Sequence, residues 1–229
     1  MSILTTFPLA PMLLSFLIPL IFFIYTKQGG WKKTGIVFFC CVAIVILYPI
    51  IFFISTEETH TIVYFLGKLV LFTLFPLIVL TYVEKDNLQV FLQKIGVRKQ
   101  HLGLSILLGL LSIIVTLLIA LLVSFQSSAL TDPLWNIIMF VDAFNEEFLF
   151  RGILLLYLMK LTNMPIAYAT SVLAFTLAHP QYFSSMFLIS TLVQGVLLGL
   201  ITIKTKNILG PWISHGLNRT IIQGLRLIF

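Results

Sequence analysis

The feature that most constrains this chain is a series of apolar runs, each about as long as a bilayer is thick. A transmembrane helix needs about 20 predominantly apolar residues. Eight runs meet this measure, at 8–26, 34–54, 62–83, 102–125, 134–159, 165–179, 184–203 and 208–229. We therefore expect an all-α, polytopic membrane protein with about eight transmembrane helices. The count falls to seven if 165–179 or 184–203 is only partly inserted.

Composition excludes the main alternatives to a membrane protein. Hydrophobic residues make up 59% of the chain and charged residues 10%, whereas a soluble domain carries about 25% charged residues. This excludes a soluble globular protein, a disordered chain and a secreted disulfide scaffold. The net charge of +6 lies in short gaps between apolar runs, which does not fit a nucleic-acid-binding face. We expect a single integral membrane domain over 1–229, with the lipid bilayer as its surroundings.

The basic residues indicate an orientation. Ten of the fourteen fall in alternate gaps between the runs: Lys27, Lys32, Lys33, Lys85, Lys94, Arg98, Lys99, Lys160, Lys204 and Lys206. The intervening gaps 55–61, 126–133 and 180–183 contain no Lys or Arg. Cytoplasmic loops carry excess Lys and Arg, so we place the basic gaps on the cytoplasmic side of the cell membrane. An even number of spans then puts both termini outside the cytoplasm.

Ionisable residues within the fifth run are the strongest sign of function. Each costs about 2.5–3.5 kcal/mol at the centre of a bilayer and marks a functional site by default. Glu147 and Arg151 are four residues apart, so they can form an ion pair on one helix face. Glu146 points about 100° away from Glu147 and lacks that partner, so it can accept a proton from water as a general base. Asp142 lies either in an outer vestibule or in the same polar network. The alternative is that all four only fix helix packing.

Two histidines lie in apolar surroundings on later runs. His179 ends the sixth run in FTLAH, and His215 lies in the eighth run in HGLNR, before Asn218 and Arg219. A lone histidine in a membrane usually makes a hydrogen bond between helices. Together with the glutamates, however, these residues supply a base, a second imidazole and donors for an oxyanion, which are the parts needed for hydrolysis.

Three other features favour packing roles. Lys68, near the outer end of the third run, can extend its ammonium group towards the membrane surface. Gly195 and Gly199 form a GxxxG face that allows close helix approach. Gln194 beside them is interpreted as forming a hydrogen bond between helices. The alternative is that it lines a cavity.

The motifs EEFLFRG, FTLAH and HGLNR, in this order on three helices, resemble the CPBP/Abi family of intramembrane proteases. That group contains the CAAX prenyl endopeptidases and bacteriocin-processing or self-immunity homologues. The family pattern is EExxxR, then FxxxH, then HxxxN or HxxxD. The matching positions here, all within 134–220, are Glu146, Glu147, Arg151, Phe175, His179 and His215. The chain departs from the pattern at Arg219, where the family has Asn or Asp.

The resemblance implies a mechanism and a class of substrate. Glu146 and His179 would activate water for attack on a peptide carbonyl, His215 would stabilise the oxyanion, and Glu147 with Arg151 would form a structural pair. The substrate would be a membrane-associated peptide or protein, with no cofactor and no nucleic acid. A zinc variant would use Glu146, His179 and His215 as ligands.

The departure at Arg219 leaves alternatives open. Asn218 or Arg219 could replace the missing oxyanion donor, since each lies within about 60° of His215 around the helix. Arg219 could instead turn the site into a pocket that binds without cleaving, as in an immunity protein against a membrane-active peptide. A proton-coupled transporter using Glu146 is a third possibility, although we see no inverted repeat of the kind transporters carry.

Depth along the helices sets a further requirement. Counting from the basic gaps puts His215 about 13 Å and His179 about 28 Å into the membrane. The two histidines meet Glu146 only if the sixth run starts late, tilts strongly or follows a dipping segment at 152–164.

Overall fold

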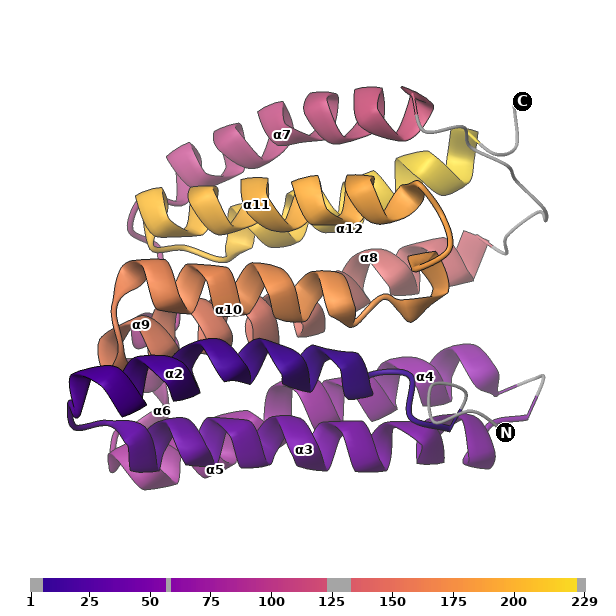
Figure 1. The fold of residues 1–229 in the computed structure, drawn as a ribbon. Coiled ribbons are helices and arrows are strands. Elements are labelled where there is room, and N and C mark those ends of the chain that lie inside the picture. Colours follow the sequence, from indigo (N-terminus) through magenta and orange to yellow (C-terminus); the bar gives the residue numbers. More distant parts are fainter. Residues whose placement is uncertain (1–5, 57–58, 123–132, 226–229) are drawn as a thin grey trace.

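The structure, a computed structural model, describes residues 6–56, 59–122 and 133–225. Within these ranges the chain is helical and contains no strand. Figure 1 shows long helices lying side by side as a bundle, with the early helices along one edge and α7 along the opposite edge. The all-α fold expected from the apolar runs is therefore confirmed.

Each expected span corresponds to a helical segment. In chain order these are η1 (Ala10–Phe16) with α2 (Leu17–Thr26); α3 (Trp31–Ile54); α4 (His60–Lys68), η2 (Leu69–Leu74) and α5 (Phe75–Glu84); α7 (Leu102–Leu122); α8 (Pro133–Glu147), η3 (Phe148–Tyr157) and α9 (Leu158–Leu161); α10 (Met164–Leu177); α11 (Phe187–Thr205); and α12 (Leu209–Leu225). Two short helices, α6 (Leu88–Lys94) and η4 (Pro180–Tyr182), lie in the connections.

Among the residues that the structure describes, four helical segments are long and apolar enough to cross a membrane, namely Trp31–Ile54, His60–Glu84, Leu102–Ile119 and Phe187–Thr205. Ala10–Thr26 and Met164–Leu177 are apolar but shorter. The count of eight spans therefore stays a prediction. The ends of two expected spans, at 123–125 and 226–229, and most of the gap 126–133 lie outside the described residues.

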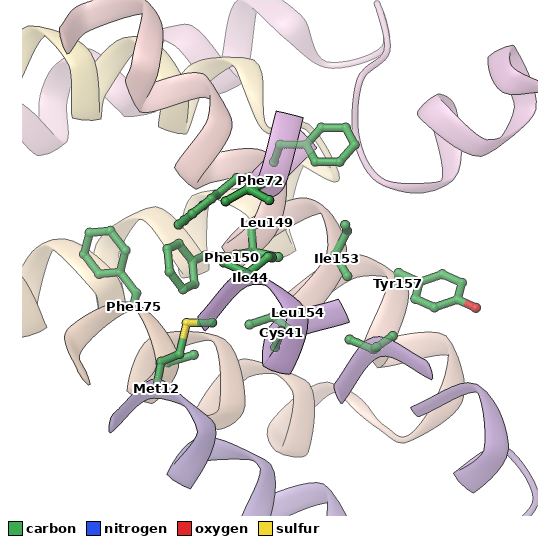
Figure 2. Packing of buried hydrophobic residues seen from close by; sticks show 14 of the residues in the cluster. Met12, Cys41, Ile44, Phe72, Leu149, Phe150, Ile153, Leu154, Tyr157 and Phe175 are labelled. Atoms are coloured by element: carbon green, nitrogen blue, oxygen red, sulfur yellow. The ribbon is translucent and has the colours of Figure 1, made fainter. Parts of the chain in front are cut away.

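The segment η3 is the centre of the hydrophobic core. It is a π-helix, a form frequent at functional sites, and all of its residues are buried. Figure 2 shows Leu149, Phe150 and Ile153 of η3 among side chains from η1, α3, η2 and α10. The rings of Phe150 and Phe175 meet edge to face, 5.4 Å apart. This packing holds Glu146 and Glu147, at the end of α8, next to the core.

Small residues bring helices close together near the site. Gly195 and Gly199 of α11 face α10, where an added Cβ would lie 3.2 Å from the Phe175 ring and 2.7 Å from the Tyr168 ring. This agrees with the close approach expected of the GxxxG pair. Between α7 and α12, Gly109 contacts the backbone of Gly210. Both contacts position the helices that carry the two histidines.

Asparagine side chains define where two of these helices begin. Asn163 accepts a hydrogen bond from the Ile166 backbone N–H at 3.0 Å and caps α10, the usual role of Asn at a helix start. Asn207 accepts one from the Leu209 N–H at 2.9 Å at the start of α12. Its amide also donates to the backbone of Arg98, so α12 starts from a turn that is tied to the α6–α7 connection.

Candidate active site

A cavity of about 480 Å³ lies between the helices. One part of its wall is aromatic and the other is polar and ionisable. The aromatic lining comes from Tyr48, Phe52, His60, Tyr64, Phe72 and Trp135. The polar lining comes from Lys68, Glu146, His179, Ser190, Thr191, Gln194, His215, Asn218 and Arg219. The cavity thus gathers residues from most of the motifs singled out in the sequence.

Glu146 and the two histidines converge in this wall. The Oε2 atom of Glu146 lies 3.8 Å from Nε2 of His179 and 3.8 Å from Nε2 of His215. Glu146 is 6% exposed, and its buried Oε2 has no hydrogen-bond partner among the described residues. A buried polar atom without a partner is costly. The geometry therefore suits a small polar group, such as a water molecule, between the carboxylate and the imidazoles.

The structure brings His179 to Glu146 along α10, which begins at Met164, four residues after Lys160. Glu146 lies fifteen residues before Leu161, where α9 ends, and His179 lies fifteen residues after Met164, where α10 begins. Two antiparallel helices joined by a short turn place such positions at the same level. The sequence estimate placed Glu146 at mid-span but counted His179 from the cytoplasmic end.

His215 reaches the same level because its helix begins inside the protein. The turn before α12 is buried, with Asn207 and Ile208 fully covered. The Ile208 backbone N–H donates to the Gly96 carbonyl at 3.0 Å. His215 therefore needs only six further residues of α12 to reach Glu146.

The Nδ1 atom of each histidine is held by an acceptor. Nδ1 of His179 lies 2.7 Å from the Phe175 carbonyl, and Nδ1 of His215 lies 2.9 Å from Oε1 of Glu147. Neither acceptor carries a hydrogen, so each Nδ1 must be the donor. In the neutral rings both Nε2 atoms then present lone pairs towards Glu146.

Glu147 and Arg151 form the ion pair expected from their spacing. Nη1 of Arg151 lies 3.1 Å from Oε1 of Glu147, and both side chains are fully buried. Arg151 also donates from Nη2 to the Gly195 carbonyl at 3.4 Å and lies 4.2 Å from the centre of the Phe175 ring. Glu147 thus links the guanidinium group to the imidazole of His215.

Lys68 does not extend to the membrane surface, and that interpretation is wrong. It is 2% exposed, and its Nζ lies 2.6 Å from Oδ2 of Asp142 and 2.6 Å from Oε1 of Glu146. A buried ammonium needs compensating carboxylates, and α8 supplies two. The sequence carried a signal for this role, because a lone cation within an apolar run requires a partner.

Arg219 contacts the same two carboxylates. Its Nη1 lies 3.2 Å from Oε1 of Glu146 and 3.4 Å from Oδ2 of Asp142, and its Nη2 donates to Sδ of Met139 at 3.1 Å. Glu146 therefore has two cationic partners, contrary to the expectation that it lacks one. Asp142 is fully buried in this network and does not line an outer vestibule.

Asn218 lies beside the cluster in the cavity wall. Its Oδ1 lies 3.1 Å from the Thr116 hydroxyl, which also lies 3.2 Å from the Ser112 carbonyl and 3.1 Å from the Ile113 carbonyl; the amide Nδ2 is a donor. Arg219, by contrast, has its donors directed at Glu146, Asp142 and Met139. Of the two expected oxyanion donors, the local bonding favours Asn218.

The geometry does not fit the zinc alternative. In a tetrahedral site with bonds of 2.0–2.1 Å, ligand atoms lie about 3.3 Å apart, whereas Glu146 is 3.8 Å from each imidazole. Lys68 and Arg219 also place two positive charges beside this carboxylate. No group of three His, Cys, Asp or Glu residues suited to a metal ion occurs in the part of the chain that the structure describes.

A protein-family model described as type II CAAX prenyl endopeptidase Rce1-like matches residues 127–221. This segment contains all three motifs and extends a few residues beyond the range 134–220 assigned from them. Neither the curated proteins nor the solved structures include a significant match to the chain.

Proposed function

We propose that the protein is an intramembrane endopeptidase that hydrolyses a peptide bond with activated water, because residues 127–221 match an Rce1-like family model and the chain forms a bundle of apolar helices. The observation that carries this proposal is the unpaired Oε2 of Glu146, facing Nε2 of both His179 and His215 at 3.8 Å in a cavity wall. These atoms can hold one water molecule between them.

In the proposed mechanism, Glu146 is the general base. A water molecule donates one hydrogen to Oε2 of Glu146 and the other to Nε2 of His179. As the water oxygen bonds to the substrate carbonyl carbon, one proton passes to Oε2. Glu146 then returns this proton to the amide nitrogen as the C–N bond breaks, which leaves a carboxylic acid and an amine. No covalent intermediate with the enzyme forms.

His215 and Asn218 are placed to stabilise the oxyanion. To donate from Nε2, His215 must carry a hydrogen on both ring nitrogens, which gives the ring a positive charge. The carboxylate of Glu147, 2.9 Å from Nδ1, compensates this charge. Donors directed at a developing oxyanion are commonly worth a factor of about 10²–10³ in rate. Asn218 takes the part that the family assigns to the residue at the position of Arg219.

The proposed substrate is a membrane-associated peptide or protein, because the site lies among helices in an apolar bundle. We propose no cofactor and no nucleic-acid partner, in keeping with the poor zinc geometry and the distribution of charge.

We also propose the cell membrane as the location, with both termini outside the cytoplasm. The C-cap residues of α2, α5 and α11 are Lys27, Lys85 and Lys206, on the side assigned to the cytoplasm, where cations suit helix C-termini.

The test compares cells that express the wild type with cells that express Glu146→Gln, which keeps the size of the side chain but removes the base. New N-termini in membrane proteins are then quantified by mass spectrometry. We expect a set of new N-termini with the wild type and its loss with Glu146→Gln. A peptide spanning one such site, cleaved by pure enzyme in H₂¹⁸O, should carry the label in its new carboxylate. Identical N-termini in both strains would refute hydrolysis.

A second candidate is a protein that binds a peptide without cutting it, such as an immunity protein. One observation favours it: Lys68 and Arg219 both bind Oε1 of Glu146, and these ion pairs compete with proton transfer to the carboxylate. Under this alternative, protection against a membrane-active peptide would survive Glu146→Gln. Under the leading proposal the phenotype would be lost.

A further inference from the structure

Gln194 is a buried donor in the cavity wall that has no role in the hydrolytic cluster described above. It lies on α11, is 8% exposed and lines the cavity. Its Nε2 is buried and has no hydrogen-bond partner within the described ranges of the chain. An unpaired buried amide is unfavourable, so a donor of this kind is suited to a partner that enters the cavity.

The backbone at Gln194 is held firmly beside the catalytic cluster. The carbonyl of the next residue, Gly195, accepts a hydrogen bond from Arg151, and Gly195 packs against the Phe175 ring. That ring contacts both imidazoles, at 4.9 Å from His179 and 5.5 Å from His215. Gln194 therefore lies next to a residue, Gly195, that contacts the same Phe175 ring as the two histidines.

Two neighbouring polar groups of the cavity are already engaged. The Thr191 hydroxyl, on the same helix, donates to the Phe187 carbonyl at 3.2 Å. Arg219 donates to Glu146 and to Met139. These contacts are internal to the protein, whereas the Nε2 of Gln194 is left for a ligand.

We infer that Gln194 is a substrate-binding residue whose Nε2 donates a hydrogen bond to a backbone carbonyl of the bound peptide. This inference rests on the proposed peptide substrate. An extended peptide carries one carbonyl per residue, and a fixed donor in the wall sets the register of the chain against Glu146. We assign Gln194 to a carbonyl other than the reacting one, so that the bond would be equally strong before and during reaction.

An interaction that is equally strong in the bound substrate and in the transition state changes KM and leaves kcat unchanged. We expect Gln194→Met, which has a similar size and no donor, to raise KM about 3- to 10-fold for a peptide spanning a mapped cleavage site. The kcat should stay within about 2-fold of wild type. Thr202→Val is the matched control, because its hydroxyl is bonded within α11 to the Leu198 carbonyl at 2.8 Å and the residue does not line the cavity, so it should leave KM unchanged. A fall in kcat at constant KM would overturn the inference.

Thermal unfolding separates this role from the interhelical hydrogen bond considered for Gln194 in the sequence. Replacing an unpaired donor by an apolar group of similar shape is neutral or stabilising. The melting temperature of ligand-free Gln194→Met should therefore equal or exceed that of the wild type. A lower melting temperature would indicate a bond between helices and would count against the inference.

A binding measurement keeps the test independent of catalysis. The probe is a fluorescent farnesylated CAAX peptide, together with analogues in which one backbone carbonyl at a time is reduced to CH₂. In the Glu146→Gln background, Gln194→Met should weaken binding of the unmodified peptide about 3- to 10-fold. It should not weaken binding of the one analogue that lacks the carbonyl bonded by Gln194. Equal weakening of every analogue, or no binding by the starting protein, would overturn the inference. If the expected pattern appears without cleavage by the wild type, only the hydrolytic proposal fails.

Discussion

Lys68 and Glu146, 78 residues apart in the chain, are joined by an ion pair of 2.6 Å. Because Nζ of Lys68 binds Oε1, the other carboxylate oxygen is left facing the two imidazoles. Asp142, one turn earlier on α8, binds the same ammonium at 2.6 Å. A residue outside the family motifs thus fixes the orientation of the proposed base.

The two adjacent glutamates should respond differently to removal of their charge. Glu146→Gln cannot accept a proton, so cleavage should fall about 10²–10⁴-fold. Glu147→Gln keeps the base but removes the carboxylate that pairs with Arg151 and compensates the charge on His215, so its loss of activity should be smaller and its loss of stability larger. Cleavage rate and thermal unfolding, measured in the same micelles, test this. The assignment of roles would be wrong if Glu147→Gln lost more activity and less stability than Glu146→Gln.

Removing Lys68 should destabilise the protein strongly. Lys68→Met leaves two buried carboxylates with Arg219 as the remaining cation, and breaking a buried pair in this way costs about 3–5 kcal/mol. The charge-balanced double variant Lys68→Met with Asp142→Asn should recover part of this loss in a double-mutant cycle. The measurement is denaturant unfolding in micelles.

The control for this series is Lys33→Met, which removes a pair with Glu84 in which the lysine side chain is 43% exposed. An exposed pair contributes only about 0–1 kcal/mol. Similar stability losses for Lys33→Met and Lys68→Met would argue against a tightly coupled buried cluster.

Arg219→Asn should keep or raise the rate of cleavage. The substitution removes one of two cations bound to Oε1 of Glu146 and restores an amide where the resembled family has one. Arg219→Lys, which keeps the charge, serves as the control and should stay close to wild type. Loss of the peptide phenotype in a folded Arg219→Asn protein would instead support the binding candidate.

Metal removal should leave the activity unchanged. The proposed nucleophile is water activated by Glu146, and the ligand spacing around it does not match zinc. We expect the same cleavage rate before and after dialysis against a strong chelator. Loss of activity that is restored by added zinc would replace the proposed mechanism with the metal-dependent one.

Two glycines on α7 should differ sharply when changed to alanine. A Cβ at Gly109 would meet the backbone of Gly210 on α12, whereas a Cβ at Gly103 would meet nothing. Gly109→Ala should therefore separate α7 from α12 and cost about 1–3 kcal/mol, while Gly103→Ala should be neutral or slightly stabilising. Thermal unfolding of both variants tests the contact, and equal melting temperatures would contradict it.

The local pattern of the chain was sufficient for several features of the site. The four-residue spacing predicted the Glu147–Arg151 pair, and the small residues Gly195 and Gly199 indicated a close helix contact. Both depend on helix periodicity alone. The convergence of His179 with Glu146 was also implicit in the sequence, because both lie fifteen residues from the ends of helices joined by one turn. The two residues were expected to meet, but only with a late start, a tilt or a dipping segment, because depth was counted from charges and not from the turn.

The sequence by itself determined that this protein is an α-helical membrane protein. It also identified the ionisable residues that are buried within apolar runs, since apolar length and charge spacing are properties of the chain. Only the tertiary structure decided which cations accompany Glu146. Lys68 and Arg219 come from helices far from α8 in the chain, and periodicity carries no information about which helix faces meet. Their pairing follows from packing, because a charge enclosed in an apolar bundle must find its counter-charge on whichever helix lies against it.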